Sequence, residues 1–424
     1  MPYSNKSAQS GESYIESFKL KGLEVSQGTI ELNYYESILD CSVRASAQIV
    51  DTGFRAEQQR VGESMVEKAD IDLRTSEPAQ IILVDGYQTK LNTSLILQRT
   101  RDLSESHNKA IYSLDFYTRE AADNEEKSRR VIKKYTGKPS DHVPQILKEY
   151  LGTSKKCKVD ETWNEYNVTF TTEKPFYACT YLGPKSGPLR GAGALAGYLF
   201  FENADGYNFR SIDVLMSEAP KRKLIYNDLV EKTPPPGYDA KILNYAYDNT
   251  LDLNEALLTS SLGIAKKDTF SHVDSYYEIS SFDSNAQYQV WNTGGKRFPN
   301  PMKKETKIFT KWSDEGVNPP GSISNQIGKS KEVNFNADQI LRQSYMRYNN
   351  LYTIKLSIAI PLDLDLKAGD KVICDFPEVS SKSFKIVSQK KSGIYMIADL
   401  CHHITPKRGN YTRLNLVRET VDKK

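Results

Sequence analysis

The clearest pattern of hydrophobic and polar positions lies near the carboxyl end of the chain. Residues 352–360 alternate large apolar side chains with small or polar ones. A period of two places the tyrosine, the leucine and three isoleucines of this run on one face of a strand, which the pattern predicts to be buried. Pro361 ends the run, because proline cannot donate to a ladder.

Three further runs complete this region. A turn at 368–370 precedes a predicted strand at 371–376, and two more strands, 393–403 and 410–419, are joined by a polar hairpin loop. Four strands joined by short turns indicate half of a β-barrel, and the region contains no group of residues typical of a catalytic site. The pattern favours a structural building block over a catalyst.

The first 120 residues show a similar β-rich pattern, with an Asp85-Gly86 turn signal between two of the runs. Each barrel-like region ends in Arg-Glu, at 119–120 and 418–419, and each has a tyrosine seven residues earlier. When the two regions are aligned on these residues, their apolar positions fall out of phase. The similarity is therefore compatible with a duplicated barrel and also with chance. The predicted strands are 42–50, 79–84, 95–99 and 110–119.

In the middle of the chain, the spacing of the apolar residues changes from the period of a strand to that of a helix. Residues 121–134 are charged and predict a helix, and a second helix begins at a Ser140 cap and stops at Gly152. A short helix is expected at 175–181, followed by a mobile Gly/Pro/Ala-rich loop at 183–197. The strongest hairpin signal of the chain comes next, at 198–212. Weaker patterns predict a hinge at 232–237, helices at 251–263 and 336–349, and a strand at 276–279.

Composition limits the class of protein. At 424 residues the chain suits two to four domains, and 38% hydrophobic residues can form substantial cores. The formal charge of +3 is small and the basic residues are scattered along the sequence, which argues against a dedicated nucleic-acid-binding surface. No apolar run reaches the roughly 18 residues that span a bilayer, and the polar amino terminus lacks the apolar core of a signal peptide.

The candidate chemistry is weak. The run from Gly191 to Ala196 fits a loose dinucleotide fingerprint, but an aromatic strand follows where a helix is needed, so a loop is favoured. Cys401 and His403 share a strand face and His402 points away, so a structural strand is favoured over a metal site. We therefore expect no catalytic, cofactor-binding or metal-binding residues, and no enzyme activity. The five irregularly spaced cysteines indicate free thiols in a protein made in the cytosol.

Two segments carry a resemblance to a known family. The aromatic hairpin and its extension, 198–215, resemble a characteristic segment of the baseplate central hub proteins of contractile-tailed phages. The closing strands, 392–404 and 411–419, are similar to the final meander of the same hubs. The order of β-rich start, mixed middle, hairpin, insertion and closing barrel also fits, whereas residues 240–335 show no match.

The resemblance implies a mixed α+β, β-dominated fold with two related tube-like β-barrels. The expected domains are a first barrel at 1–120, an α/β domain at 121–197, a second barrel at 198–237 and 336–424, and an insertion at 238–335. The resemblance further implies a homotrimeric, pseudo-hexameric ring in the virion baseplate that joins the tail tube to the spike. Its expected partners are the tail spike protein, tube or tube-initiator proteins and other baseplate proteins, with transient passage of the tape-measure protein and DNA. No stable nucleic-acid binding and no membrane contact are expected.

Three alternatives stay open at this level. One is the hub part of a related secretion spike or of a non-contractile tail. Another is a tail-associated cell-wall or polysaccharide hydrolase, which needs a carboxylate pair that sequence alone cannot locate. The third is a carbohydrate-binding module, which three tryptophans support only weakly.

Overall fold

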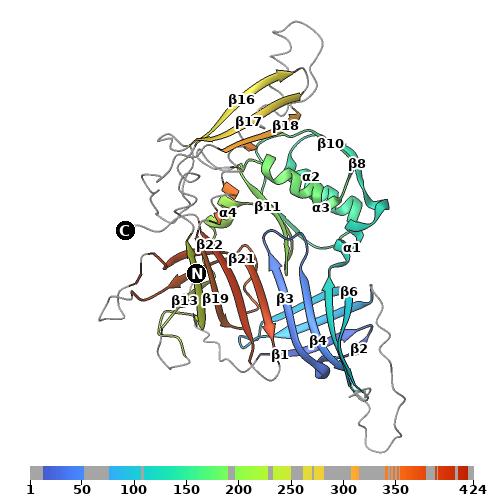
Figure 1. Ribbon diagram of the computed structural model, residues 1–424, viewed down its shortest axis with the longest axis vertical. Helices are drawn as coiled ribbons and strands as arrows, with labels where there is room; N and C mark the ends of the chain where they lie inside the picture. Colours follow the sequence, from blue (N-terminus) through green and yellow to red (C-terminus); the bar gives the residue numbers. More distant parts are fainter. Residues whose placement is uncertain are drawn as a thin grey trace, which may run out of the picture.

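The computed structural model contains two barrels that share one large sheet, a mixed middle domain and a separate three-stranded sheet (Figure 1). This mixed α+β, β-dominated architecture confirms the predicted fold class. The structure describes residues 13–51, 76–106, 109–189, 196–227, 233–249, 261–269, 272–280, 307–314, 340–341, 344, 347–348, 351–352, 354–378, 387–388, 390–405 and 409–418.

The first barrel is an antiparallel sheet in the order β3-β4-β7-β6-β5-β1-β2. The sheet folds over itself, so that Phe18 of β1 packs edge-to-face on Phe116 of β7, with ring centroids 5.8 Å apart. The long strand β6 makes this possible, because its first half pairs with β5 and its second half with β7. The strands are β1 (Tyr14–Leu20), β2 (Leu23–Glu24), β3 (Thr29–Ser37), β4 (Arg44–Asp51), β5 (Pro78–Val84), β6 (Lys90–Ser106) and β7 (Lys109–Tyr117).

The second barrel closes on itself. Its strands follow the order β13-β20-β21-β22-β19, and the segment formed by β14 and β15 pairs with both β13 and β19 to complete the ring. The alternation predicted for residues 352–360 is confirmed for Ile354, Leu356, Ile358 and Ile360, which are all buried. Tyr352, however, lies before the strand and is half-buried, and Ala359 is buried as well. The strands are β13 (Arg222–Ile225), β14 (Ala240–Lys241), β15 (Asn244–Asn249), β19 (Ile354–Pro361), β20 (Lys371–Asp375), β21 (Gly393–Ile404) and β22 (Tyr411–Arg418).

Strand β21 joins the two barrels. Its first residues pair with β20, while Asp399 to Ile404 pair on the same edge with Ser37 to Leu32 of β3. Strands β19, β22, β21, β3 and β4 therefore stand side by side in one continuous sheet (Figure 1). The two barrels also share one apolar core, which extends from Phe18 to Leu416.

The middle domain packs two helices and two small sheets around a second core, on one side of the barrel row (Figure 1). A π-helical turn, Leu147–Leu151, extends α2 and ends at Gly152, whose φ of +59° is left-handed. Strand β10 pairs with β8, and the hairpin β11–β12 pairs with β9. The elements are α1 (Arg119–Glu125), β8 (Val131–Tyr135), α2 (Pro139–Ile146), β9 (Cys157–Val159), β10 (Val168–Glu173), α3 (Pro175–Leu182), β11 (Tyr198–Asn203), β12 (Gly206–Ser211) and α4 (Ile212–Ser217).

The aromatic hairpin corrects one predicted boundary. It was assigned to the second barrel, but it pairs with β9 of the middle domain and not with a barrel strand. One of its faces packs into the core of the middle domain, whereas Leu199 and Phe201 pack with Ala368, Met396 and Val417 of the second barrel. The hairpin is apolar on both faces because it lies between two cores.

Other predictions in the middle of the chain were partly wrong. The helix expected at 121–134 ends at Glu125, and Val131–Tyr135 forms strand β8. Ser140 does not cap α2, which begins at Pro139, and its hydroxyl instead accepts a hydrogen bond from Thr162. The short helix at 175–181 is confirmed as α3. The predicted mobile loop begins with a buried 3-10 turn, Gly183–Lys185, and its residues 190–195 lie outside the described part of the chain.

The predicted insertion also needs a correction. Residues 240–249 belong to the second barrel as β14 and β15, so any insertion starts after them. Strands β16 (Ser261–Thr269), β17 (His272–Ser280) and β18 (Lys307–Asp314) form a separate antiparallel sheet, which includes the strand predicted at 276–279. The helix predicted at 251–263 is wrong for its last three residues, which are strand, and its other residues lie outside the described ranges.

The helix predicted at 336–349 falls largely outside the described residues. The positions described within it, 340, 341, 344, 347 and 348, are helical. Among the helices that the structure describes, none combines the length and the apolar character that crossing a membrane requires.

Candidate functional site

The outer face of the sheet that the two barrels share is a continuous polar surface, which spans both barrels. Eight strands lie in sequence across it, β15-β19-β22-β21-β3-β4-β7-β6. Most side chains on this side are half-buried or exposed, with Asn33 and Ala359 as buried exceptions, and most of their neighbours along the strands are buried. We call this surface the polar face, and it consists of Asn244, Ala246, Asp248, Lys355, Ser357, Ala359, Tyr411, Arg413, Asn415, Asp399, Cys401, His403, Glu31, Asn33, Tyr35, Arg44, Ser46, Gln48, Ser113, Asp115, Tyr117, Arg99 and Arg101.

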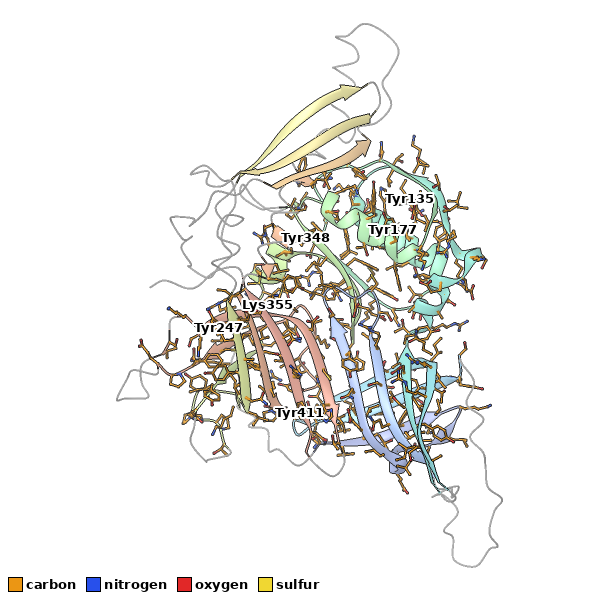
Figure 2. The ribbon with its side chains drawn as sticks, viewed as in Figure 1. Tyr135, Tyr177, Tyr247, Tyr348, Lys355 and Tyr411 are labelled. Carbon is orange, nitrogen blue, oxygen red and sulfur yellow. The ribbon has the colours of Figure 1, made fainter. Side chains whose placement is uncertain are left out.

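The strand register makes the polar face continuous through the junction of the barrels. His403 of β21 lies opposite Tyr411 on one side and Asn33 on the other. Its Nδ1 is 2.6 Å from Asn33 Oδ1, and its Nε2 is 2.7 Å from Thr405 Oγ1. Figure 2 shows Lys355 and Tyr411 at opposite ends of the β19–β22 pair, so the face covers the full length of these strands.

The Cys401-His402-His403 run has the orientation that its sequence predicts. His402 is buried, stacks on Tyr34 and lies 2.9 Å from Thr412 Oγ1, while Cys401 and His403 lie on the polar face. Burial lowers the pKa of His402 to about 3, so its ring is neutral at physiological pH. Within the described ranges, no group of three His, Cys, Asp or Glu side chains is placed to hold a metal ion.

A second feature is the point where the tip of the hairpin meets both barrels. Four consecutive residues, Glu202 to Asp205, contact them. Glu202 accepts a hydrogen bond from the Val43 amide of the first barrel (3.1 Å), and the Asn203 side chain donates to the Ala368 carbonyl of the second (3.3 Å). Asp205 forms an ion pair with Lys367. We call this segment the hairpin tip.

Glu36 of β3 completes this junction. Its carboxylate accepts hydrogen bonds from the amides of Ala204 in the hairpin tip (2.6 Å) and Ala368 in the second barrel (2.8 Å). A third bond comes from the Tyr34 hydroxyl (3.0 Å). One side chain from the first barrel therefore binds the other two parts of the molecule. Burial raises the pKa of Glu36 to about 7, against the effect of these donors.

Lys155 connects two buried carboxylates beside the hairpin tip. Its ammonium group lies 2.6 Å from Glu202 and 2.7 Å from Glu120. Burial raises the pKa of Glu202 despite the attraction of Lys155. Burial also acts to raise the pKa of Glu120, but Lys155 and a hydrogen bond from Thr153 outweigh it, so that this pKa is lowered.

A cavity of about 490 Å³ opens between β9, the hairpin and the turn before β20. Several of its charged side chains are paired: Arg210 binds Asp160 and Glu218, and Lys158 also contacts Glu218. Phe201 provides an apolar wall. The paired charges indicate a joint between the middle domain and the second barrel. Cys157 also lines the cavity, and burial raises the pKa of its thiol to about 11.

Sequence reasoning missed the junction entirely. Glu36, Lys155 and Glu202 are single charged residues in three distant segments, and nothing around them in sequence signals burial. The hairpin itself was detectable, because its aromatic strands and turn are strong local signals. The five cysteines are free, with Cys179 and Cys374 buried and the other three half-buried.

No protein-family model matches the sequence, and no curated protein matches it. A tail protein from Neisseria meningitidis MC58 has a TM-score of 0.51 at 11% identity, and the alignment covers 96% of this chain and 97% of that one. The 43 kDa tail protein of prophage MuSo2 from Shewanella oneidensis has a TM-score of 0.53 at 9% identity, with 96% and 98% covered. The chain therefore has the fold of phage tail proteins, as its resemblance to hub proteins predicted.

Proposed function

We propose that the chain is a structural tail protein, the central hub of a contractile-phage baseplate, which assembles as a homotrimeric ring. The observation that carries the proposal is the row of eight strands that crosses both barrels. Each protomer would contribute two barrels, so three protomers would present six to a hexameric tube while keeping threefold symmetry for a spike.

The ends of the row support head-to-tail assembly. Among the described strands, β15 pairs only with β19 on one edge, and on the other edge the part of β6 from Arg99 to Ser106 pairs only with β7. Such edges expose unpaired backbone groups, which proteins cover or pair. Pairing β15 of one protomer with β6 of the next would close the ring and extend the polar face into a channel wall.

The expected assembly is a trimer in solution, either alone or with the spike. Light scattering across a hundredfold concentration range should give three times the chain mass of 48.0 kDa, and electron microscopy should show a pore with six lobes. A species that stays monomeric even after titration with candidate spike proteins would contradict the hub. A trimer that binds a secretion effector and no tail-tube protein would favour the secretion-spike alternative.

The charges on the polar face also predict how strongly the channel binds DNA. Acidic residues such as Asp115 and Asp399 are interspersed with basic ones such as Arg413, so the face offers no continuous row of phosphate contacts. We expect fluorescence anisotropy with a labelled duplex to show no binding tighter than about 1 µM at physiological salt. Tighter binding with a steep salt dependence would show that the protein binds the DNA phosphates and would contradict the proposal that DNA passes through the channel without stable binding.

As part of the same proposal, we expect the protein to have no enzyme activity. A cell-wall turbidity assay, with a known muramidase as the positive control, should show no clearing by the purified protein. Clearing that persists in a highly purified sample would favour the hydrolase alternative. The proposed setting is the tail baseplate, where the spike, the tube proteins and other baseplate proteins are the partners.

A further inference from the structure

The small sheet that contains the aromatic hairpin has an open edge. Its strand order is β11-β12-β9, and among the described strands β9 pairs only with β12, in parallel. The Tyr207 amide of β12 donates to the Lys156 carbonyl. Because successive residues of a strand turn their backbone groups to opposite sides, the amide and carbonyl groups of Cys157 and Val159 point away from β12. These are the groups to which an added strand would bond.

The two faces of β9 have different surroundings. Cys157 and Val159 pack against the core of the middle domain, whereas Lys156 and Lys158 line the cavity beside the hairpin. On the cavity side, Lys158 lies opposite Asn208 of β12. The next position in this cross-strand row, beyond the edge of the sheet, is therefore the place of a side chain from an added strand.

The charges on the cavity side of this edge favour an acidic partner. Lys156 is exposed and forms no ion pair with the carboxylates that the structure describes. Lys158 is 62% exposed and shares Glu218 with the buried Arg210. The other charged residues that line the cavity already have partners, since Lys367 pairs with Asp205 and Asp370 with Lys221. Positive charge therefore exceeds negative charge next to the open edge.

We propose that the free edge of β9 is a docking site for an extended acidic segment of another protein, which adds to the sheet as a fourth strand. Its backbone pairs with Cys157 and Val159, and its acidic side chains lie at alternate positions beside Lys156 and Lys158. The side chains between them lie on the side of the middle-domain core and are apolar. The site thus takes a segment that alternates acidic and apolar residues. This inference concerns the single chain and does not rest on the proposed ring.

A short fluorescein-labelled peptide that alternates glutamate and valine tests the site on the purified full-length chain. Fluorescence anisotropy should show saturable binding that is about tenfold tighter than the binding of a matched peptide of alternating lysine and valine. Added salt should weaken the binding, because the charge pairs are exposed. Equal affinities of the two peptides, or no saturation by the acidic peptide up to about 1 mM, would overturn the proposal.

Two double variants of equal charge change locate the binding site. Lys156→Gln combined with Lys158→Gln removes both cations of the edge and should weaken the acidic peptide by about tenfold. The matched control is Lys134→Gln combined with Lys148→Gln, which removes two exposed lysines of the same domain that are not among the residues lining the cavity. This control should bind as the wild type does. An equal loss in both double variants would show that the peptide responds only to net charge, and would contradict the site.

Hydrogen exchange of the wild-type chain separates strand addition from loose electrostatic binding. With the acidic peptide bound, the amides of Cys157 and Val159 should gain about tenfold in protection. The Lys158 amide, which faces β12, should change little. Unchanged protection of Cys157 and Val159 would contradict strand pairing. Displacement of the peptide by a lower concentration of a single-stranded oligonucleotide of equal charge would assign the lysines to phosphate binding and would also overturn the proposal.

Discussion

Replacing Gly206 with alanine should destabilise the hairpin by about 3 kcal/mol or more. Gly206 has a φ of +121°, a conformation that residues with a side chain rarely adopt, and a Cβ there would lie 2.4 Å from the Lys156 carbonyl oxygen. That oxygen accepts the bond from the Tyr207 amide that joins β12 to β9, so it cannot move without breaking the small sheet. Urea unfolding, followed by hydrogen exchange of β11 and β12, measures the loss.

Gly22→Ala is the matched control. Gly22 also has a positive φ, +81°, but no atom lies within 4 Å of a Cβ built on it. Its substitution should therefore cost only the conformational strain, about 1 kcal/mol. Equal effects of the two substitutions would show that the contact with Lys156 does not constrain the turn.

Replacing Lys155 with methionine should cost about 3–5 kcal/mol at neutral pH, because it leaves Glu120 and Glu202 buried beside each other without a cation. The deficit should shrink as the pH falls towards 5. Losing Lys155 removes the attraction that opposes the effect of burial on the pKa of Glu202, so this carboxyl group takes up a proton more readily. Urea unfolding at pH 5 and pH 7.5 measures both effects.

Two further variants test this interpretation. Glu202→Gln in the Lys155→Met background should recover part of the loss, because one of the two unpaired charges is gone. Lys158→Met is the control: Lys158 has a side chain that is 62% exposed and binds the partly exposed Glu218, so its loss should cost less than 1 kcal/mol. A Lys155→Met protein as stable as Lys158→Met would show that the buried carboxylates find other partners.

Strand prediction succeeded where a strand has one buried and one polar face. The run that became β19 alternates because its inner side chains meet the barrel core and Lys355 and Ser357 face outward. Strand β3 was missed because Leu32, Asn33 and Tyr34 are all buried, which removes the period of two. Strand β8 was mistaken for helix because its buried Val131 and Tyr135 are four residues apart, a spacing compatible with both periods.

The sequence by itself determined the alternating barrel strands β4, β5, β7, β19, β20, β21 and β22, the aromatic hairpin and the resemblance to tail hubs, because these depend on local alternation and turn residues. Only the tertiary structure decided which sheet the hairpin joins, that β21 pairs with β3, and that Glu36 meets Ala204 and Ala368. The Glu36–Ala368 contact joins residues 332 positions apart, and the β21–β3 pairing joins residues that are still further apart in sequence, such as Leu32 and Ile404. Their energies depend on burial and on donors from other segments, and no local pattern of residues records either.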